Sequence, residues 1–268
     1  MKEISHFQVR NVPGQVHRVS FDGRLVDYWA PKNPTHLLVA HDGQNIFDPR
    51  TATRRFTWRM AQNAIKIFEK HGLTPPAIIG VFHSSTKENP HGRFKDLTPQ
   101  SAFQGPVKPL MKTELNVDDL NGNTYHQLIS ERIVPSITES INFKPTFENT
   151  AMVGSSMGGL ATLNALGIRK DFFATALAFS PHWVIGGKPL VDHVLNDLPK
   201  PGSHKVWMSR GDQKLDSTYK NDQDYADQLM RQLGWNSNFK STVYRGAGHN
   251  ERAWAKQISN ALEFWLLD

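Results

Sequence analysis

A serine flanked by glycines is the clearest chemical signal in the sequence. Ser156 lies in Gly154-Ser155-Ser156-Met157-Gly158-Gly159, with the spacing Gly-x-Ser-x-Gly, between a predicted strand at 150–155 and a predicted helix. On a sharp turn from strand to helix a serine hydroxyl projects outward, and the first helix amides favour negative charge beside it. The pattern predicts a nucleophile. Its other interpretation is a glycine-rich turn with a capping serine.

His249 has the residue type and the place that a general base requires. It lies in a glycine-rich loop, Gly246-Ala247-Gly248-His249-Asn250, after the last predicted strand and before the C-terminal helix. A serine is unreactive until a base removes its proton, and beside a nucleophile on such a turn the histidine comes last in the chain. His182 and Trp183 follow another strand end and are expected to contact the substrate. The remaining histidines are expected to be structural.

Two aspartates compete for the role of the acid that orients the histidine. Both lie in Arg210-Gly211-Asp212-Gln213-Lys214-Leu215-Asp216, the loop after the predicted strand 205–209. A carboxylate there would accept a hydrogen bond from the far imidazole nitrogen, which fixes the tautomer and stabilises the imidazolium. Spacing alone leaves Asp212 and Asp216 open, and either could be a turn residue that satisfies its own backbone.

The backbone amides of Gln44 and Met157 are the expected oxyanion hole. An acyl-transfer site needs two amides aimed at the developing negative oxygen, one of them directly after the nucleophile. The second is expected from His41-Asp42-Gly43-Gln44-Asn45, where a strand ends and Gly43 permits a tight turn. Asp42 is expected to contact the substrate. Taken alone, the same segment is an ordinary Asp-Gly turn.

Strands and helices alternate along most of the chain. The segments 16–21 and 25–30 predict an antiparallel hairpin around Asp22-Gly23, and apolar runs predict buried strands. These buried strands are expected at 37–41, 77–83, 150–155, 174–180, 205–209 and 241–245. Helices are expected near 56–71, 124–140, 157–168, 220–233 and 252–266. The order predicts an α/β protein with a mostly parallel sheet covered by helices on both faces.

One long segment falls outside this alternation. Residues 84–123 hold four prolines and three glycines and lack clear periodicity. A connection of this length inside a compact domain is more often functional than neutral, so it predicts a lid or a substrate-binding excursion. The length of 268 residues and the 38% hydrophobic content predict a single domain over 1–268.

Composition excludes several classes of function. The absence of cysteine rules out disulfides, a thiolate zinc site and a cysteine nucleophile. The formal charge of +6 is spread along the chain, which argues against nucleic acid as a partner and favours an anionic substrate. No apolar run is long enough for a membrane span, and the first residues lack a secretory signal. A cytoplasmic protein without a membrane partner is expected; the oligomeric state is left open.

Four segments together resemble a known family. They are 41–48, 154–159, 211–216 and 248–254, and in this order they are similar to the Putative esterase family, which groups siderophore esterases, feruloyl esterases, S-formylglutathione hydrolases and mycolyltransferases. The similarity spans roughly 15–266. It implies an α/β-hydrolase fold, a Ser-acid-His triad and no metal or organic cofactor. It also matches Ser156, His249, Gln44 and Met157 to the family's nucleophile, base and oxyanion donors.

One position departs from the family pattern. Many members carry an acid three residues after the loop glycine, where this chain has Lys214, which cannot orient an imidazole. Asp216 is the nearest carboxylate further along and is therefore preferred over Asp212.

The expected activity is hydrolysis of a small-molecule carboxylic ester through an acyl-enzyme on Ser156. A siderophore or an aromatic ester is the candidate substrate class. Acyl transfer by the same residues, or a binding protein that keeps the fold without catalysis, are the alternatives.

Overall fold

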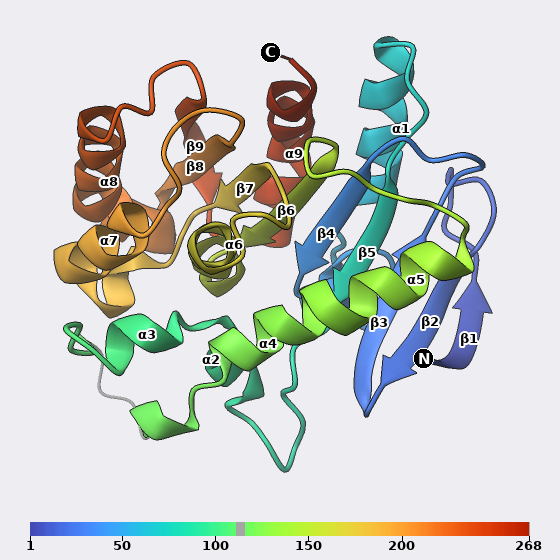
Figure 1. Ribbon diagram of the computed structural model, residues 1–268, viewed down its shortest axis with the longest axis horizontal. Helices are drawn as coiled ribbons and strands as arrows, with labels where there is room; N and C mark the ends of the chain where they lie inside the picture. The colour runs from blue at the N-terminus through green and yellow to red at the C-terminus, as the bar shows by residue number, and fades with distance from the viewer. Residues whose placement is uncertain (111–115, 268) are drawn as a thin grey trace.

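A single mixed β-sheet forms the centre of the protein in the computed structural model, which describes residues 1–110 and 116–267 (Figure 1). In the described part of the chain the strand order is β1-β2-β3-β5-β4-β6-β7-β8-β9. The strands are β1 (Lys2–Phe7), β2 (Val16–Phe21), β3 (Arg24–Trp29), β4 (Leu37–His41), β5 (Ala77–Val81), β6 (Thr150–Ser155), β7 (Thr175–Phe179), β8 (Lys205–Gln213) and β9 (Phe239–Gly248).

Antiparallel pairing at the N-terminal end changes to parallel pairing in the rest of the sheet. β1, β2, β3 and β5 pair antiparallel, whereas β5-β4, β4-β6, β6-β7, β7-β8 and β8-β9 are parallel. The β2-β3 hairpin turns at Asp22 and Gly23, whose φ angles of 49° and 90° are those of a turn that matches strand twist. The predicted hairpin and the predicted mostly parallel sheet are confirmed.

Helices fill the connections between the strands. The α-helices are α1 (Met60–Lys70), α2 (Gly92–Leu97), α3 (Gln100–Phe103), α4 (Gly122–Leu128), α5 (Val134–Ser140), α6 (Met157–Ile168), α7 (Gly187–Asn196), α8 (Lys220–Gln232) and α9 (Glu251–Leu266). Short 3₁₀ segments are η1 (Gly43–Asn45), η2 (Thr53–Arg55), η3 (Val117–Asp119), η5 (Trp183–Ile185) and η6 (Lys214–Tyr219), and the π-helical η4 (Ile129–Ile133) joins α4 to α5. None of the described helices is long and apolar enough to cross a membrane.

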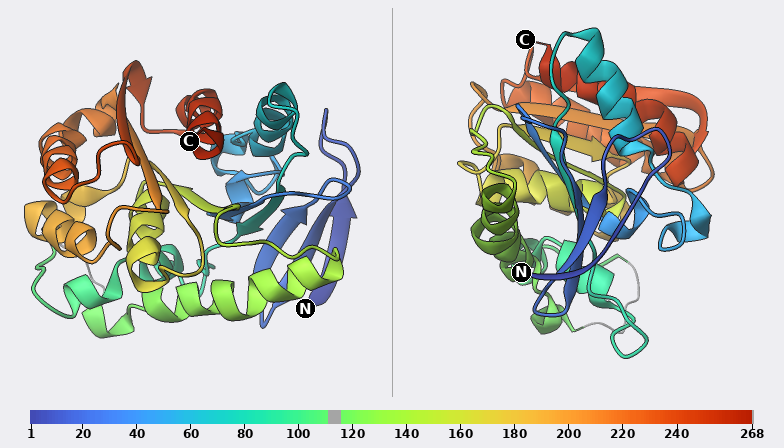
Figure 2. Two further views of the ribbon diagram at one scale, coloured as in Figure 1. Left: turned by 45° about the horizontal axis from the view of Figure 1, so that its top comes forward. Right: turned by 90° about the vertical axis from the view of Figure 1, so that its right-hand side faces the viewer.

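Both faces of β4 to β7 are buried, and helices lie on both sides of the sheet, as Figure 2 shows. Along β4, Leu38 and Ala40 pack in the cluster that holds α1 and α9, whereas Leu37 and Val39 pack in the cluster that holds α4 to α8. Every residue of β4 to β7 is buried. Because these strands are buried on both faces, their sequences are continuous apolar runs and do not alternate between apolar and polar residues. The arrangement confirms the predicted α/β-hydrolase fold.

Several elements were not predicted from the sequence. β1 (KEISHF) is exposed along almost its whole length, so it lacks the apolar pattern that marks the other strands. The helix expected near 124–140 is α4, η4 and α5 in succession. The segment 84–123 contains α2, α3 and η3 where no periodicity was seen, and its residues 111–115 lie outside the described part of the chain. Its role as a lid stays a prediction.

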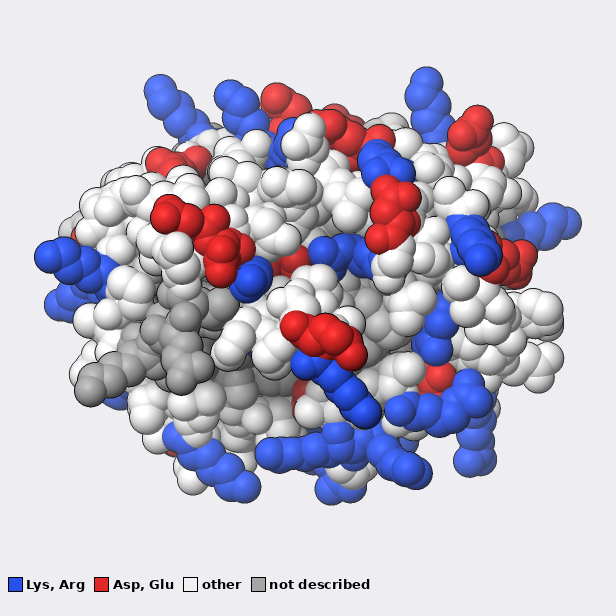
Figure 3. Space-filling model, turned by 90° about the horizontal axis from the view of Figure 1, so that it is seen from below, with Lys and Arg blue, Asp and Glu red and all other residues white. Residues whose placement is uncertain are grey.

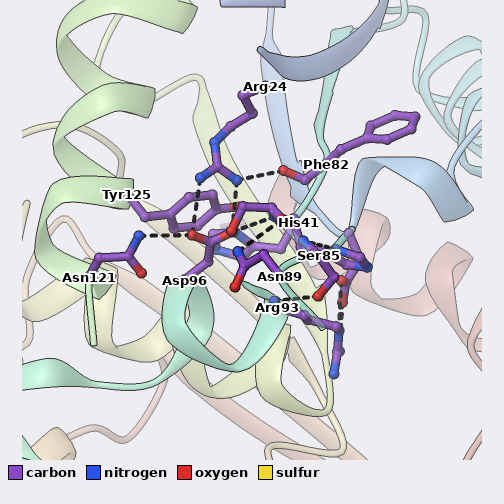
Figure 4. A network of polar contacts seen from close by, with 12 residues as sticks. Arg24, His41, Phe82, Ser85, Asn89, Arg93, Asp96, Asn121 and Tyr125 are labelled. Carbon is purple, nitrogen blue, oxygen red and sulfur yellow. Dashed lines mark hydrogen bonds and ion pairs between the residues drawn. The ribbon is translucent and has the colours of Figure 1, made fainter. Parts of the chain in front are cut away.

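A buried polar cluster lies where β4 and β5 end (Figure 4). Arg24 donates two hydrogen bonds to Asp96, at 2.8 and 3.0 Å, and its guanidinium lies 5.0 Å from the ring centre of Tyr125. The Tyr125 hydroxyl lies 2.9 Å from Nδ1 of His41, and the ring of His126 packs edge-on against His41. The cluster ties the N-terminal hairpin to α2 and α4 near the carboxyl ends of β4 and β5.

Neutral histidines in this cluster predict loss of stability in acid. Burial lowers the pKa of His41 from 6.5 to about 4 and lowers the pKa of His126 well below its ordinary value. The unfolded chain therefore binds more protons, so this stability is fully present above about pH 6.5 and is lost as the pH falls toward 4. Urea unfolding is expected to show a nearly constant free energy of unfolding from pH 8 to about pH 6.5 and a falling one from there to pH 5.

The contribution of one histidine can be isolated by substitution. His126→Phe removes one buried titratable ring, so its free energy of unfolding should fall less steeply with acid, by up to about 1.4 kcal/mol per pH unit. His71→Gln, at an exposed position after α1, is the matched control and should keep the wild-type slope. Equal slopes for wild type and His126→Phe would contradict a neutral, buried His126.

Candidate active site

Ser156 occupies the turn between β6 and α6 in a strained backbone conformation. Its φ of 57° and ψ of −123° are rare for a residue with a side chain, and such outliers gather at functional sites. Two bonds hold the turn: Ser156 N–H donates to the Phe179 carbonyl at 2.9 Å, and Leu160 N–H donates to the Ser156 carbonyl at 3.0 Å. A Cβ on Gly154 would lie 2.3 Å from the Gly158 carbonyl oxygen, so only glycine fits there.

Asp216 is the carboxylate that meets His249. Its Oδ1 lies 2.6 Å from Nδ1 of His249, and the carboxylate is 1% exposed. Its Oδ2 accepts hydrogen bonds from the Gly211 amide at 2.6 Å and from the Ser180 hydroxyl at 2.9 Å. A carboxylate held by three donors presents one fixed oxygen to the imidazole, which places the ring proton on Nδ1 and leaves Nε2 as the basic nitrogen.

Asp212, the alternative acid, hydrogen-bonds to the neighbouring loop and not to the histidine. Its Oδ1 accepts from the Gly246 amide at 2.8 Å and from the side chain of Gln213 at 3.0 Å. Lys214, at the position where the family pattern has an acid, adopts a left-handed φ of 56° at the start of η6. This turn brings Asp216, two residues later, under the imidazole.

The His249 ring also packs against an aromatic side chain. Trp254 meets it edge-on with ring centres 4.9 Å apart, and its indole N–H donates to the Ser180 hydroxyl at 3.3 Å. Within the described residues no hydrogen bond joins Nε2 of His249 to the Ser156 hydroxyl. Catalytic hydrogen bonds without substrate are often long, so this separation is compatible with a general base.

The two amides predicted to form the oxyanion hole each lie at the start of a helix. Met157 is the first residue of α6 and Gln44 is the second of η1, and the first amides of a helix have no acceptor within it. Gln44 and Ser156 line the same pocket. Gly43 allows η1 to approach β5, because a Cβ there would lie 2.2 Å from the Gly80 carbonyl oxygen.

A pocket of about 300 Å³ opens over Ser156. Its lining combines polar side chains with one indole: Asp42, Gln44, Asn45, Thr53, Arg54, His83, Arg93, Ser155, Ser156, His249, Glu251 and Trp254. Two of these side chains are cationic. On the face toward which β4 and β5 point, Lys and Arg side chains gather along one border (Figure 3).

Asp42 is engaged by an arginine from the segment 84–123. Arg93, on α2, donates through Nε and one terminal nitrogen to the two carboxylate oxygens, at 2.8 and 2.7 Å. Burial would raise the pKa of Asp42, but the Arg93 guanidinium outweighs it and the pKa stays below its ordinary value. Gln44 donates its side-chain amide to the same carboxylate at 3.2 Å. Asp42 thus lines the pocket with both oxygens occupied.

His182 and Trp183, expected to contact the substrate, lie outside the lining of this pocket. Trp183 is fully buried, and its indole N–H donates to the side-chain oxygen of Gln223 at 3.1 Å. His182 follows β7, and Nδ1 of its ring forms a close hydrogen bond with the hydroxyl of Tyr219. Both residues follow the end of β7 and therefore lie near the site. The side chain of Trp183, however, packs in the apolar core and not in the pocket.

Comparison with known proteins places the chain in a family. The profile of the family described as Putative esterase matches residues 16–265. The chain belongs to this family. It is also 24% identical, over 218 residues, to the uncharacterized protein YbbA of Bacillus subtilis, covering 76% of this chain and 80% of YbbA.

Solved structures with the same fold include other members of the esterase group. The BES protein from Bacillus cereus superposes with a TM-score of 0.67 at 19% identity, covering 98% of each chain. The siderophore hydrolase EstA from Aspergillus nidulans gives a TM-score of 0.61 at 17% identity, covering 97% of this chain and 94% of EstA. At these identities the likeness is one of fold. Membership in the esterase family supports hydrolysis of a carboxylic ester.

Four polar residues of this esterase site were missed by reasoning from the sequence. Arg93 and Ser180 bind the carboxylates of Asp42 and Asp216, Tyr219 lies against His182, and Glu251 lines the pocket beside the base. Only Glu251 had a local signal, since it directly follows the His249 loop. The others contact the site across 33 or more residues of sequence, so only the folded chain reveals them.

Removal of Arg93 tests its contact with Asp42. Arg93→Ala leaves the buried Asp42 carboxylate without its cation, so the free energy of unfolding should fall by roughly 2 kcal/mol. Ester hydrolysis should also slow, because Asp42 directly precedes the loop that carries Gln44. Urea unfolding and steady-state kinetics measure the two effects.

Two further variants make the result specific. Lys95→Ala, on the same helix, breaks only an exposed ion pair with Asp119 and should change stability by less than about 1 kcal/mol. Adding Asp42→Asn to Arg93→Ala removes the unpaired charge and should recover part of the lost stability. A double variant less stable than Arg93→Ala would contradict the hypothesis that Arg93 stabilises the protein by pairing with the Asp42 carboxylate.

Proposed function

We propose that the protein is a serine esterase in which Ser156 is the nucleophile, His249 the general base and Asp216 the acid that orients the base. The observation that carries the proposal is the 2.6 Å contact between Asp216 and Nδ1 of His249, beside a strained serine turn that shares one pocket with the histidine. This combination of a fixed imidazole and an outward serine is what activates a hydroxyl for acyl transfer.

The reaction would proceed through an acyl-enzyme. Nε2 of His249 takes the Ser156 proton as the oxygen attacks the ester carbonyl, and the amides of Gln44 and Met157 stabilise the tetrahedral oxyanion. The same imidazolium then protonates the leaving alcohol. In the second half, His249 removes a proton from water, which attacks the acyl carbonyl and releases the acid from Ser156.

An anionic ester is the proposed substrate class, with siderophore esters as the first candidates. EstA is named as a siderophore hydrolase, and another solved structure of the same fold, with a TM-score of 0.62, is named an enterobactin and salmochelin hydrolase. Within the pocket of this chain Arg93 is paired with Asp42, Arg54 supplies a further positive charge, and the whole chain carries +6. Positive charge in a cleft raises the local concentration of anionic substrates.

Substitution of the nucleophile is the direct test. Ser156→Ala should lower the hydrolysis of p-nitrophenyl esters by roughly three to six orders of magnitude, because no other group can form the acyl-enzyme. It should also abolish covalent labelling by a fluorophosphonate. Wild-type protein that neither hydrolyses esters nor labels would favour a non-catalytic binding protein with this fold.

The two loop aspartates form a matched pair for the acid. Asp216→Asn should lower kcat by roughly 10⁴-fold, since an amide favours the wrong tautomer of His249. Asp212→Asn alters a carboxylate that only holds the neighbouring loop, and its kcat should stay within about threefold of wild type. The opposite ranking of the two variants would remove Asp216 from the proposed triad.

A further inference from the structure

Tyr219 is a polar residue of the site that the proposed triad does not use. It ends η6, the short helix that also carries Asp216, and it is 1% exposed. Its ring meets that of His249 with centres 5.4 Å apart. The phenol oxygen is therefore a third polar group next to the base and the nucleophile.

The Tyr219 hydroxyl lies beside two side chains. It forms a close hydrogen bond with Nδ1 of His182. Burial raises the pKa of its phenol, and the neighbouring Ser156 hydroxyl lowers that pKa in part. The backbone fixes the same neighbourhood, since His182 N–H donates to the Ser156 carbonyl at 3.2 Å. Tyr219, held by His182, thus lies beside the His249 ring and next to the turn that carries Ser156.

Both partners keep a defined protonation state. Burial, together with the nearby Asp216 carboxylate, raises the pKa of Tyr219 well above its ordinary value, so the phenol keeps its proton. Burial, with His249 and Arg93 nearby, lowers the pKa of His182 to about 4, so its ring is neutral at neutral pH. A neutral imidazole with its proton on Nδ1 donates to the phenol oxygen and leaves the phenol proton free to point at Ser156.

We propose that Tyr219 is a further catalytic residue, which donates a hydrogen bond to Oγ of Ser156 whenever that oxygen carries negative charge, and that His182 positions the phenol. The proposal rests on the esterase mechanism above. When Oγ has given its proton to Nε2 of His249, it can only accept, and the protonated phenol is a donor already beside it. Tyr219 keeps its own proton throughout. All proton transfers in the reaction therefore remain those between Ser156, His249, the leaving alcohol and water.

The second half of the reaction depends most on this bond. In deacylation the bond from Oγ to the acyl carbon breaks and Oγ departs with negative charge until His249 protonates it. A donor on a departing oxygen becomes stronger in the transition state and accelerates the step. In acylation of an activated ester the leaving group is p-nitrophenolate, which needs no such help. Loss of the phenol hydroxyl should therefore slow deacylation more than acylation.

Tyr219→Phe removes the hydroxyl and keeps the ring. With p-nitrophenyl acetate, kcat should fall roughly tenfold or more, as expected for one hydrogen bond to a charged group. KM should fall with it, kcat/KM should change little, and stopped-flow should show a burst of p-nitrophenol. Tyr225→Phe is the matched control, because the hydroxyl of Tyr225, on α8, donates to Asp192 of α7 at 2.6 Å; this variant should behave as wild type.

Substitutions of His182 separate positioning from packing. His182→Ala should lower kcat in the wild-type background but change nothing further in Tyr219→Phe, because both act through one hydrogen bond. His182→Asn places an amide nitrogen where Nδ1 lies and should restore most of kcat. A merely structural histidine would instead give additive losses and no rescue by asparagine.

Failure of this proposal differs from failure of the esterase mechanism. An unchanged kcat in Tyr219→Phe, or equal losses in kcat and kcat/KM without a burst, would overturn the role of Tyr219 while wild type still hydrolyses esters and Ser156 still labels with fluorophosphonate. Absence of labelling and of wild-type turnover would overturn both.

Discussion

The close approach of β6 to the start of α6 is the constraint on which the site depends. The chain reverses within a few residues, and Gly154 and Gly158 pass so closely that a single added methyl group would overlap a carbonyl oxygen. The cost of the left-handed φ at Ser156 is offset by backbone bonds to β7 and α6 and by complete burial of the strand. The serine is held by the core of the sheet, so its direction does not vary with the surface loops.

Loops from the ends of neighbouring parallel strands then supply the partners of this serine. Asp216 follows β8, His249 follows β9, and Ser180 follows β7, so adjacent strands bring together groups that are far apart in sequence. The acid is buried, yet its oxygens meet a ring nitrogen, an amide and a hydroxyl, which offset the cost of removing a carboxylate from water.

The fold could be predicted from the sequence because strands that are buried on both faces leave continuous apolar runs. The strands β4 to β8 all have such runs. Sequence patterns failed for β1, whose exposed residues carry no pattern, and for α7, which begins at Gly187 with a proline two residues later. The serine and histidine stand in local motifs and were predictable. Asp216 and Asp212 are the same residue type four positions apart, so the sequence could not decide between them. The turn at Lys214, which directs Asp216 toward His249, is seen only in the structure. Arg93 contacts Asp42, which is 51 residues away in sequence, and no local pattern predicts such a contact.

The ion pair between Arg93 and Asp42 also limits how the segment 84–123 can be exchanged between relatives. A grafted segment would have to bring a cation to the Asp42 carboxylate, or be accompanied by a neutral residue at position 42. Arg24 imposes a second condition, because its two bonds to Asp96 join the same segment to the first hairpin. The segment 84–123 is thus linked by charge to the segments that carry Asp42 and Arg24, and exchange of one without the other leaves a buried ion without a partner.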